Sequence, residues 1–345
     1  MTQTYVYQSS ATLEKIAPEL LVTAAMDDPI FEIFPIKPIN SSRLRWTIQD
    51  NFRGLMGLRG LGGSPVRAQI VGTNIYETSP AAFGEFMDID ELEMTNRAAG
   101  IPANQDIPVN VSDLVSERQE QLTIRQVQRM KQLCYTLVLT GTVSVNLPDG
   151  AAGWANAYTP QAATVSPLWS STTTAHPLTD LRSLQPTYGF GTSGRFGRGA
   201  KMYMNTATMN YALNNSLATD LGGKRLDFGQ TINFLPQLNA LLMAADLPMI
   251  VINDDGYITD AGVFTLFIPT GKIIVVAQRE SAPGAFQVTR NVNNPDKGAR
   301  PYAFVKDYTV GPAKTVPPRI EVHQGFNGGP VVRRASQIVI LTVSS

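Results

Sequence analysis

The sequence of 345 residues is poor in the residues that most often carry enzyme chemistry. It has one cysteine, Cys134, so an intrachain disulfide and a metal site built from several cysteines are both excluded. It has only two histidines, His176 and His323. A dyad of Cys134 with either histidine would require the thiol to leave the apolar stripe of a long predicted helix, where a free cysteine usually acts as a small core residue.

The sequence also lacks a phosphate-binding motif. The stretch RGLMGLRGLGGSPVRAQIVG (Arg53–Gly72) is rich in glycine, but no lysine occurs between Lys37 and Lys131, which excludes a Gly-Lys-Ser/Thr loop there. Pro65 and the alternating residues after it do not fit a dinucleotide fingerprint, which requires a helix at that point. NDDGYITDAG, from Asn253, lacks the closing glutamate of a calcium loop and is typical of a turn. We therefore expect no cofactor and no metal.

Net charge and long apolar runs are absent as well. The 28 basic and 28 acidic residues balance to zero, and charged residues make up 16% of the chain. This argues against a dedicated nucleic-acid binder, which normally has a basic excess, and it suits a surface largely used in protein contacts. No apolar run approaches the roughly 18 residues of a transmembrane helix, and the first residues lack a secretory signal pattern. We expect no membrane association.

The first forty residues predict an apolar arm. SSATLEKIAPELLVTAAMDD is compatible with one short helix, whereas PIFEIFPIKPIN (Pro29–Asn40) is expected to be extended and to form no helix, because each proline disfavours the helical conformation of the residue before it. This extended part contains Phe31 and Phe34. Because an apolar extended segment is not stable alone in water, it must lie either on its own core or on another copy of the chain.

Residues 43–93 predict a long two-stranded hairpin with segregated charge. RLRWTIQ alternates polar and apolar residues like a strand with one solvated face, and GLRGLGGSP suits a turn. The outgoing leg is basic, and the returning leg is acidic with no base. The basic residues are Arg43, Arg45, Arg53, Arg59 and Arg67, against the single acid Asp50; the acidic residues are Glu77, Glu85, Asp88, Asp90, Glu91 and Glu93.

The strongest helical pattern is Val111–Thr140, whose length of about 45 Å makes it a spine. A strand follows in TVSVNLPDG, and a short helix with Pro177 in its first turn is predicted in HPLTDLRSLQ. Beyond the hinge Gly189–Ala200, strands and helices alternate, with NDDG predicting a hairpin turn between two strands. The chain closes with two strands in RIEVHQGFNGGPVVRRASQIVILTV. We expect the last one to join the sheet that begins after the long helix.

In this order, the stretches resemble the major capsid proteins of tailed bacteriophages with the Hong Kong 97 (HK97) fold, in particular the lambda-type E family. The resemblance covers nearly the whole chain, and its specific part is the joint order. It is carried by RLRWTIQDNFRGLMGLRGLGGSPVRAQIVGTNIYET, SERQEQLTIRQVQRMKQLCYTLVLTGTVSV, PLWSSTTTAHPLTDLRSL, MIVINDDGYITDAGVFTLFIPTGKIIVVAQRESAPGAFQ and the closing strands.

The resemblance implies an α+β fold with five parts. These are an N-terminal arm (1–42), an extended β-hairpin or E-loop (43–93), a P-domain with the spine helix at about 111–140 (94–188), an inserted A-domain (189–305) and closing P-domain strands (306–345). It implies a structural protein, not an enzyme. Copies would assemble in the host cytoplasm into hexamers and pentamers of an icosahedral shell, the virion capsid, around double-stranded DNA.

The resemblance also implies contacts between copies and further partners. The expected intersubunit residues are Arg45, Arg53, Arg59, Arg67, Glu85, Asp88, Asp90, Glu91, Phe31 and Phe34. The absence of lysine from the hairpin excludes the isopeptide bonds that some relatives form there. An arm of about forty residues leaves no room for a cleavable scaffolding segment. The expected partners are therefore other copies, a separate scaffolding protein, a portal, an optional cement protein and weakly bound DNA. The alternatives are an encapsulin-type compartment and, more remotely, a hydrolase or lectin-like binding domain.

Overall fold

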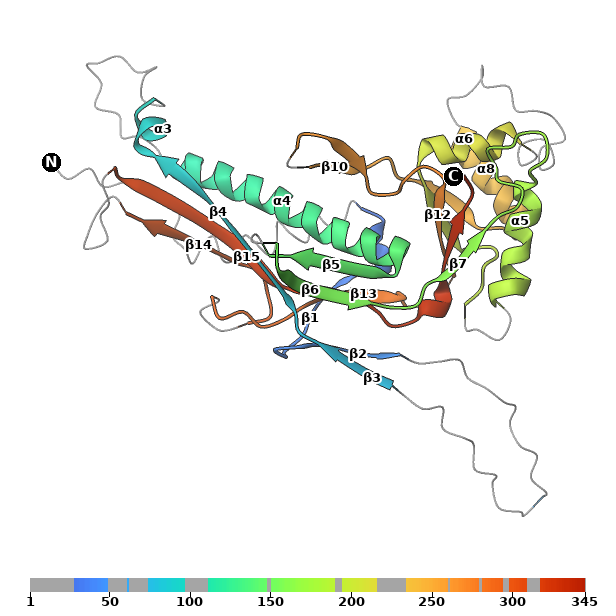
Figure 1. Ribbon diagram of the computed structural model, residues 1–345, viewed down its shortest axis with the longest axis horizontal. Coiled ribbons are helices and arrows are strands. Elements are labelled where there is room, and N and C mark those ends of the chain that lie inside the picture. Colours follow the sequence, from blue (N-terminus) through green and yellow to red (C-terminus); the bar gives the residue numbers. More distant parts are fainter. Residues whose placement is uncertain are drawn as a thin grey trace.

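The computed structural model is an elongated mixed α+β molecule in which one long helix runs beside a sheet and a second sheet lies near one end of that helix (Figure 1). The residues described are 28–48, 61, 74–96, 111–147, 150–189, 194–215, 234–259, 261–278, 281–293, 298–308 and 317–344. The short helix predicted before residue 28 and the distal part of the predicted hairpin, apart from Leu61, lie outside these residues.

The spine helix is confirmed as α4, Val111–Thr140. Its apolar side chains recur at helical spacing and are buried along most of its length; they include Leu114, Val115, Leu122, Val127, Met130, Leu133, Cys134, Leu137 and Val138. The helix ends at Gly141, whose φ of 76° closes the last turn and whose N–H donates to the carbonyl of Leu137 at 2.9 Å.

The sheet beside α4 is organised around one long strand, β15 (Arg319–Val332). It pairs antiparallel with β4 (Ala81–Asp90), β14 (Tyr302–Asp307) and β13 (Gly284–Val288), and β13 pairs in parallel with β1 (Ile36–Pro38). The first half of α4 packs against one face of this sheet. That contact is made by Leu114, Val115 and Leu122 of the helix with Ile89, Ala303, Ile320 and Val322 of the strands.

The second sheet has the strand order β7-β16-β12-β8-β9, from Gln161–Thr164, Ile338–Thr342, Lys272–Val276, Lys201–Met204 and Met249–Ile252. Helices α5 (Pro177–Leu184), α6 (Thr206–Asn214) and α8 (Phe234–Ala244) cover one face. The second half of α4 packs against the other face, where it meets Tyr203, Ile274, Ile338 and Ile340. The spine helix therefore joins both sheets into one body.

Shorter elements complete the described chain. They are α3 (Glu91–Asn96), the hairpins β5–β6 (Thr142–Asn146 with Ala152–Ala157) and β10–β11 (Gly256–Ile258 with Phe264–Leu266), the π-helical turn Gln185–Gly189 and the 3-10 turn Ala335–Gln337.

The predicted two-stranded hairpin is confirmed only at its base. β2 (Leu44–Ile48) pairs with β3 (Asn74–Thr78), but the acidic returning segment continues as β4, which leaves the hairpin and pairs with β15. The physical reason lies in its alternate apolar side chains: Ile89 is fully buried and Met87 partly buried against the α4 core. Such a strand has to join a sheet that is covered on that face.

Three further expectations are wrong. Pro29–Asn40 is not free of helix, because Ile30–Ile33 form one turn, α2. Pro29 stands just before this turn, where its missing N–H costs no hydrogen bond. NDDG does not link paired strands, since β9 pairs with β8 and β10 with β11. The last strand, β16, joins the second sheet between β7 and β12, because four of its five residues are buried and both of its edges need partners.

Candidate functional site

The residues considered for enzyme chemistry do not converge in the described part of the chain. Cys134 is fully buried inside the α4 core, where burial and then the charge of Asp28 raise the pKa of its thiol well above the ordinary value. His176 directly precedes α5, and His323 lies on β15. Among the described residues, no three histidine, cysteine, aspartate or glutamate side chains gather as metal ligands. None of the described helices has the length and apolar character needed to cross a membrane.

The base of the hairpin β2–β3 is held to the body through the backbone of Arg45. Its N–H donates to Oε1 of the buried Gln287 at 3.1 Å, and Nε2 of Gln287 donates to its carbonyl at 2.8 Å. The side chain of Arg45 remains exposed and faces Glu77 across the strand pair. Strands β2 and β3 lie at the lower edge of the body in Figure 1, and Ile75 is 62% exposed on β3. Arg53, Arg59 and Arg67 lie outside the described residues.

The acidic residues of β4 and α3 differ in what they contact. Glu85 accepts two hydrogen bonds from Arg125 of α4, at 2.6 and 3.1 Å, and this arginine lowers the pKa of the Glu85 carboxyl. Asp90 accepts from the N–H of Glu93 at 2.7 Å. Asp88, Asp90 and Glu91 are exposed. Glu85 therefore already has a partner in its own chain, which the sequence did not reveal because Arg125 is forty residues away on another element.

Phe31 and Phe34 lie in the core of their own chain. Phe34 is fully buried and Phe31 is 9% exposed, in one cluster with Met130, Phe286 and other residues of α4 and the sheet. A Cβ added at Gly284 would lie 2.5 Å from the Phe34 ring, which shows how closely the ring is enclosed. Their apolar character is explained by burial in their own chain, without a neighbouring copy.

A buried polar cluster fixes the start of the described chain on α4. The carboxylate of Asp28 lies 2.8 Å from Nζ of Lys131 and accepts hydrogen bonds from the hydroxyl of Tyr135 at 3.0 Å and from the N–H of Ile30 at 2.8 Å. Asn253, after β9, donates to the same tyrosine hydroxyl. This cluster was not predicted, because nothing in a sequence shows which acid meets Lys131.

The face of the first sheet that points away from α4 carries an unpredicted aromatic and charged group. His323 is stacked between Phe86 and Phe304, with ring centroids 5.1 and 4.7 Å apart. Its Nε2 lies 2.9 Å from the carboxylate of Glu321, which also binds Arg319 at 2.9 Å. Across the strands, Glu321 faces Asp88 of β4 and Lys306 of β14. The single histidine of this sheet therefore has a structural partner.

This group predicts a pH-dependent contribution to stability. Burial raises the pKa of the Glu321 carboxyl, but His323, Arg319 and Lys306 outweigh it, and the net pKa is below the ordinary value of 4.5. A carboxyl whose pKa is lowered by folding stabilises the protein above its unfolded pKa, and the stabilisation is lost as pH falls through the folded pKa. We expect Glu321→Gln to lose less thermal stability than the wild type between pH 5 and roughly pH 3.

Differential scanning calorimetry across that pH range measures the effect, and Glu120→Gln, an exposed change on α4, is the matched control. A Glu321→Gln protein whose unfolding temperature falls in parallel with those of the wild type and the control would contradict the role assigned to Glu321.

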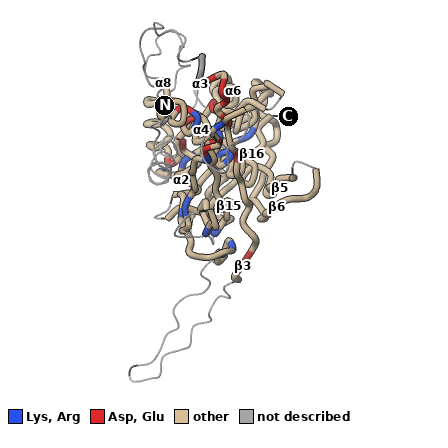
Figure 2. The backbone as a smooth tube through the Cα atoms, turned by 90° about the vertical axis from the view of Figure 1, so that its left-hand side faces the viewer, with Lys and Arg blue, Asp and Glu red and all other residues tan. Residues whose placement is uncertain are grey.

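Basic and acidic residues are unevenly distributed over the body. Figure 2 shows basic residues near the end from which β2–β3 projects and acidic ones around α3. Near the hairpin base, Lys37, Arg45, Arg333 and Arg334 line one hollow together with Trp46. Four basic side chains thus gather at the hairpin base in the described part of the chain.

No protein-family model matches the sequence, and no curated protein matches it either. Solved structures do match over nearly the full length. One of them is the putative capsid protein of a prophage from E. coli CFT073 (TM-score 0.57, 14% identity, 98% of this chain and 100% of that chain). The second is a phage-related protein from Bordetella bronchiseptica RB50 (TM-score 0.54, 12% identity, 94% and 95%). The third is the capsid of a native GTA particle (TM-score 0.51, 11% identity, 99% and 93%).

These matches show the fold. The chain is a mixed α+β protein with the HK97-like capsid fold, as the resemblance in the sequence implied.

Proposed function

We propose that the chain is a major capsid protein of tailed-bacteriophage type, whose copies assemble into the hexamers and pentamers of an icosahedral shell around double-stranded DNA. The observation that carries this proposal is the match to a prophage capsid protein over 98% of this chain and all of the other. A fold shared end to end leaves little room for an additional catalytic domain within the chain. The role is therefore structural and not enzymatic.

The parts of the fold can be assigned to the domains expected of such a capsid protein. We assign the arm to residues 1–42 and the E-loop to β2, β3 and the residues between them. The sheet around β15, with the first half of α4, corresponds to the P-domain. The sheet β7-β16-β12-β8-β9 with its helices corresponds to the A-domain. Strands β4 and β13 pair with β15 and β7 pairs with β16. In support of these assignments, we propose to place β4 and β13 with the P-domain and β7 with the A-domain, in place of the boundaries near residues 93, 189 and 306.

The proposed contacts between copies join the basic hairpin of one copy to acidic residues of another. Arg45, Arg53, Arg59 and Arg67 are the donors, and Asp88, Asp90 and Glu91 are the principal acceptors. Arginine suits this place because its planar group binds a carboxylate through two hydrogen bonds and is less strongly hydrated than lysine. Glu85 is a weaker candidate, since Arg125 already binds it. With no lysine in the hairpin, these contacts are noncovalent.

The remaining partners follow from the same proposal. A separate scaffolding protein would control assembly, a portal would occupy one vertex, and a cement protein would be optional. Contact with the packaged DNA would be weak and independent of its base sequence, because a neutral chain gains little from the release of counterions. The protein would then be part of the virion and would assemble in the host cytoplasm.

Electron microscopy of the expressed protein, with and without the products of its neighbouring genes, tests the function. We expect closed particles of uniform size, and DNA inside them when portal and packaging proteins are present. Particles that enclose a protein cargo in place of DNA would favour an encapsulin-type compartment. A stable monomer that never assembles, even with its neighbours, would contradict both functions.

A further inference from the structure

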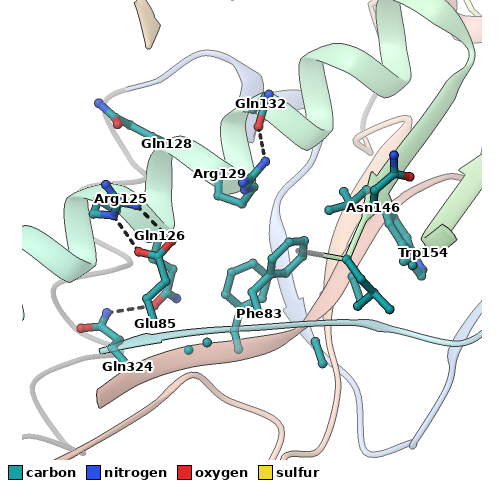
Figure 3. Close-up of a pocket in the computed structure, with 18 of the residues that line it drawn as sticks. Phe83, Glu85, Arg125, Gln126, Gln128, Arg129, Gln132, Asn146, Trp154 and Gln324 are labelled. Carbon is teal, nitrogen blue, oxygen red and sulfur yellow. Dashed lines mark hydrogen bonds and ion pairs between the residues drawn. The ribbon is translucent and has the colours of Figure 1, made fainter. Parts of the chain in front are cut away.

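A groove of about 760 Å³ lies between β4, α4, the β5–β6 hairpin, the end of β10 and the middle of β15 (Figure 3). Of the acids proposed above for contacts between copies, only the weaker candidate Glu85 lines it. Its walls come from five stretches that are far apart in sequence, and the described residues of its lining combine aromatic rings, amides and two arginines.

The groove reaches the edge of β4 as well as the face of the sheet that lies against α4. Every residue from Ser79 to Glu85 lines it, and Gln324, Gly325 and Phe326 of β15 line it from the sheet face. In the part of the chain that the structure describes, β4 pairs with β15 alone, so its other edge has no strand beside it. Such an edge offers backbone donors and acceptors to an added strand.

One end of the groove is apolar. Phe83 of β4 stacks on Phe326 with the ring centroids 5.1 Å apart. Trp154 of β6 stands beside them, and its Nε1 donates to the carbonyl of Ser79 at 2.7 Å. Leu147 and Ile258 are 52% and 69% exposed at the rim. An aromatic or large aliphatic side chain entering here would cover these surfaces from water.

The other end is cationic and contains an unpaired donor. Arg125 and Arg129 project from α4, and Glu85, bound by Arg125, is the one acid among the described residues that line the groove. Gln126 is 7% exposed; its Oε1 accepts from Gln324 at 2.8 Å, but its Nε2 is buried without a hydrogen-bond partner. A buried donor without a partner costs free energy, and a bound oxygen atom would relieve that cost.

We propose that this groove binds an extended peptide of a partner protein, which adds as a strand to the free edge of β4. The peptide carries an apolar side chain for the Phe83–Trp154 end and, two residues away on the same side, a carboxylate for the arginine end. Backbone pairing supplies affinity, and the two ends supply specificity, as in other strand-addition complexes. The charge of the arginines selects an acidic partner, and the amide of Gln126 donates to one of its oxygens.

A symmetric probe tests this without assuming the direction of the added strand. It is a fluorescein-labelled peptide, Ser-Thr-Glu-Thr-Phe-Thr-Glu-Thr-Ser, titrated with the full-length protein and followed by fluorescence anisotropy. Two matched peptides carry lysine in place of both glutamates, or proline in place of the two threonines beside phenylalanine. We expect saturable binding of the acidic probe and at least about tenfold weaker binding of each control, because one removes the charge pairing and the other the backbone pairing.

The protein variant Arg129→Glu should weaken binding of the acidic probe by about tenfold or more and strengthen binding of the lysine peptide. Arg182→Glu, on the exposed side of α5, should change neither affinity. Circular dichroism confirms that both variants fold. Equal binding of all three peptides, or an affinity unchanged by Arg129→Glu, would overturn the proposal. Binding to free subunits that disappears in assembled particles would also overturn it, because the occupant would then be a second copy. Whether shells form is a separate observation, so the two proposals can fail independently.

Discussion

Replacing Phe34 with alanine is expected to lower the free energy of unfolding of the isolated subunit by about 3–5 kcal/mol. The ring is fully buried among residues of α4 and the first sheet, and its removal leaves a cavity in the core that α4 shares with both sheets. Urea denaturation of the unassembled protein, followed by circular dichroism, measures the loss. Phe264→Ala, which truncates a phenylalanine that is 58% exposed on β11, should change stability by no more than about 0.5 kcal/mol.

This comparison also decides whether the Phe34 ring, at the end of the arm, is buried by its own chain or by a neighbouring copy. A Phe34→Ala variant that loses less than about 1 kcal/mol as a free subunit, but fails to assemble, would show that the ring is buried by a neighbouring copy. It would restore the contact that was expected from the sequence.

Reversing the charge of the hairpin with Arg53→Glu, Arg59→Glu and Arg67→Glu together is expected to abolish closed particles while leaving the subunit folded. Each contact between exposed charges contributes only about 0–1 kcal/mol, but a shell repeats every contact in every subunit, and reversal replaces attraction with repulsion. Analytical ultracentrifugation separates particles from subunits. The triple lysine variant keeps the charge and is the matched control; we expect it to assemble less well than the wild type but still to form particles.

The partner of the hairpin is tested by complementation. Asp88→Lys, Asp90→Lys and Glu91→Lys introduced into the glutamate variant should restore particles at least in part, since the pairs made by positions 53, 59 and 67 are then opposite in charge again, although the unchanged Arg45 would face lysine. Full assembly of the triple glutamate variant on its own would show that these arginines do not hold copies together.

The elements that could be predicted are those whose structure is determined by their own residues, and not by contacts with distant parts of the chain. Val111–Thr140 is a helix because its own residues repeat at helical spacing for thirty positions, and α5 begins where Pro177 is well tolerated. The identity of strand partners is not local. The alternation in β4 indicates a strand equally well in a hairpin or in a sheet, and only the burial of Ile89 under α4 decides between them. The partners of β16 were missed for the same reason.

The candidate site, too, could be predicted only where it depends on neighbouring residues of the sequence. The sequence showed that arginines and acids are segregated, and the exposed Arg45 and Asp88 agree with a surface role. It did not show that Arg125 binds Glu85 or that the Phe34 ring is enclosed, because both depend on elements brought together by the fold. The groove beside β4 is formed by five separate segments, and no short motif marks it.

The central claim is that one copy of this chain is completed by contacts with another, made by the hairpin that each copy extends. A density map of the assembled particle, obtained by electron cryo-microscopy, tests it most directly. The account predicts that β2, β3 and the residues between them lie against an adjacent copy, with Arg53, Arg59 or Arg67 within hydrogen-bond distance of its carboxylates. A particle in which this hairpin touches only its own chain, or a protein that stays monomeric under all conditions of assembly, would contradict it.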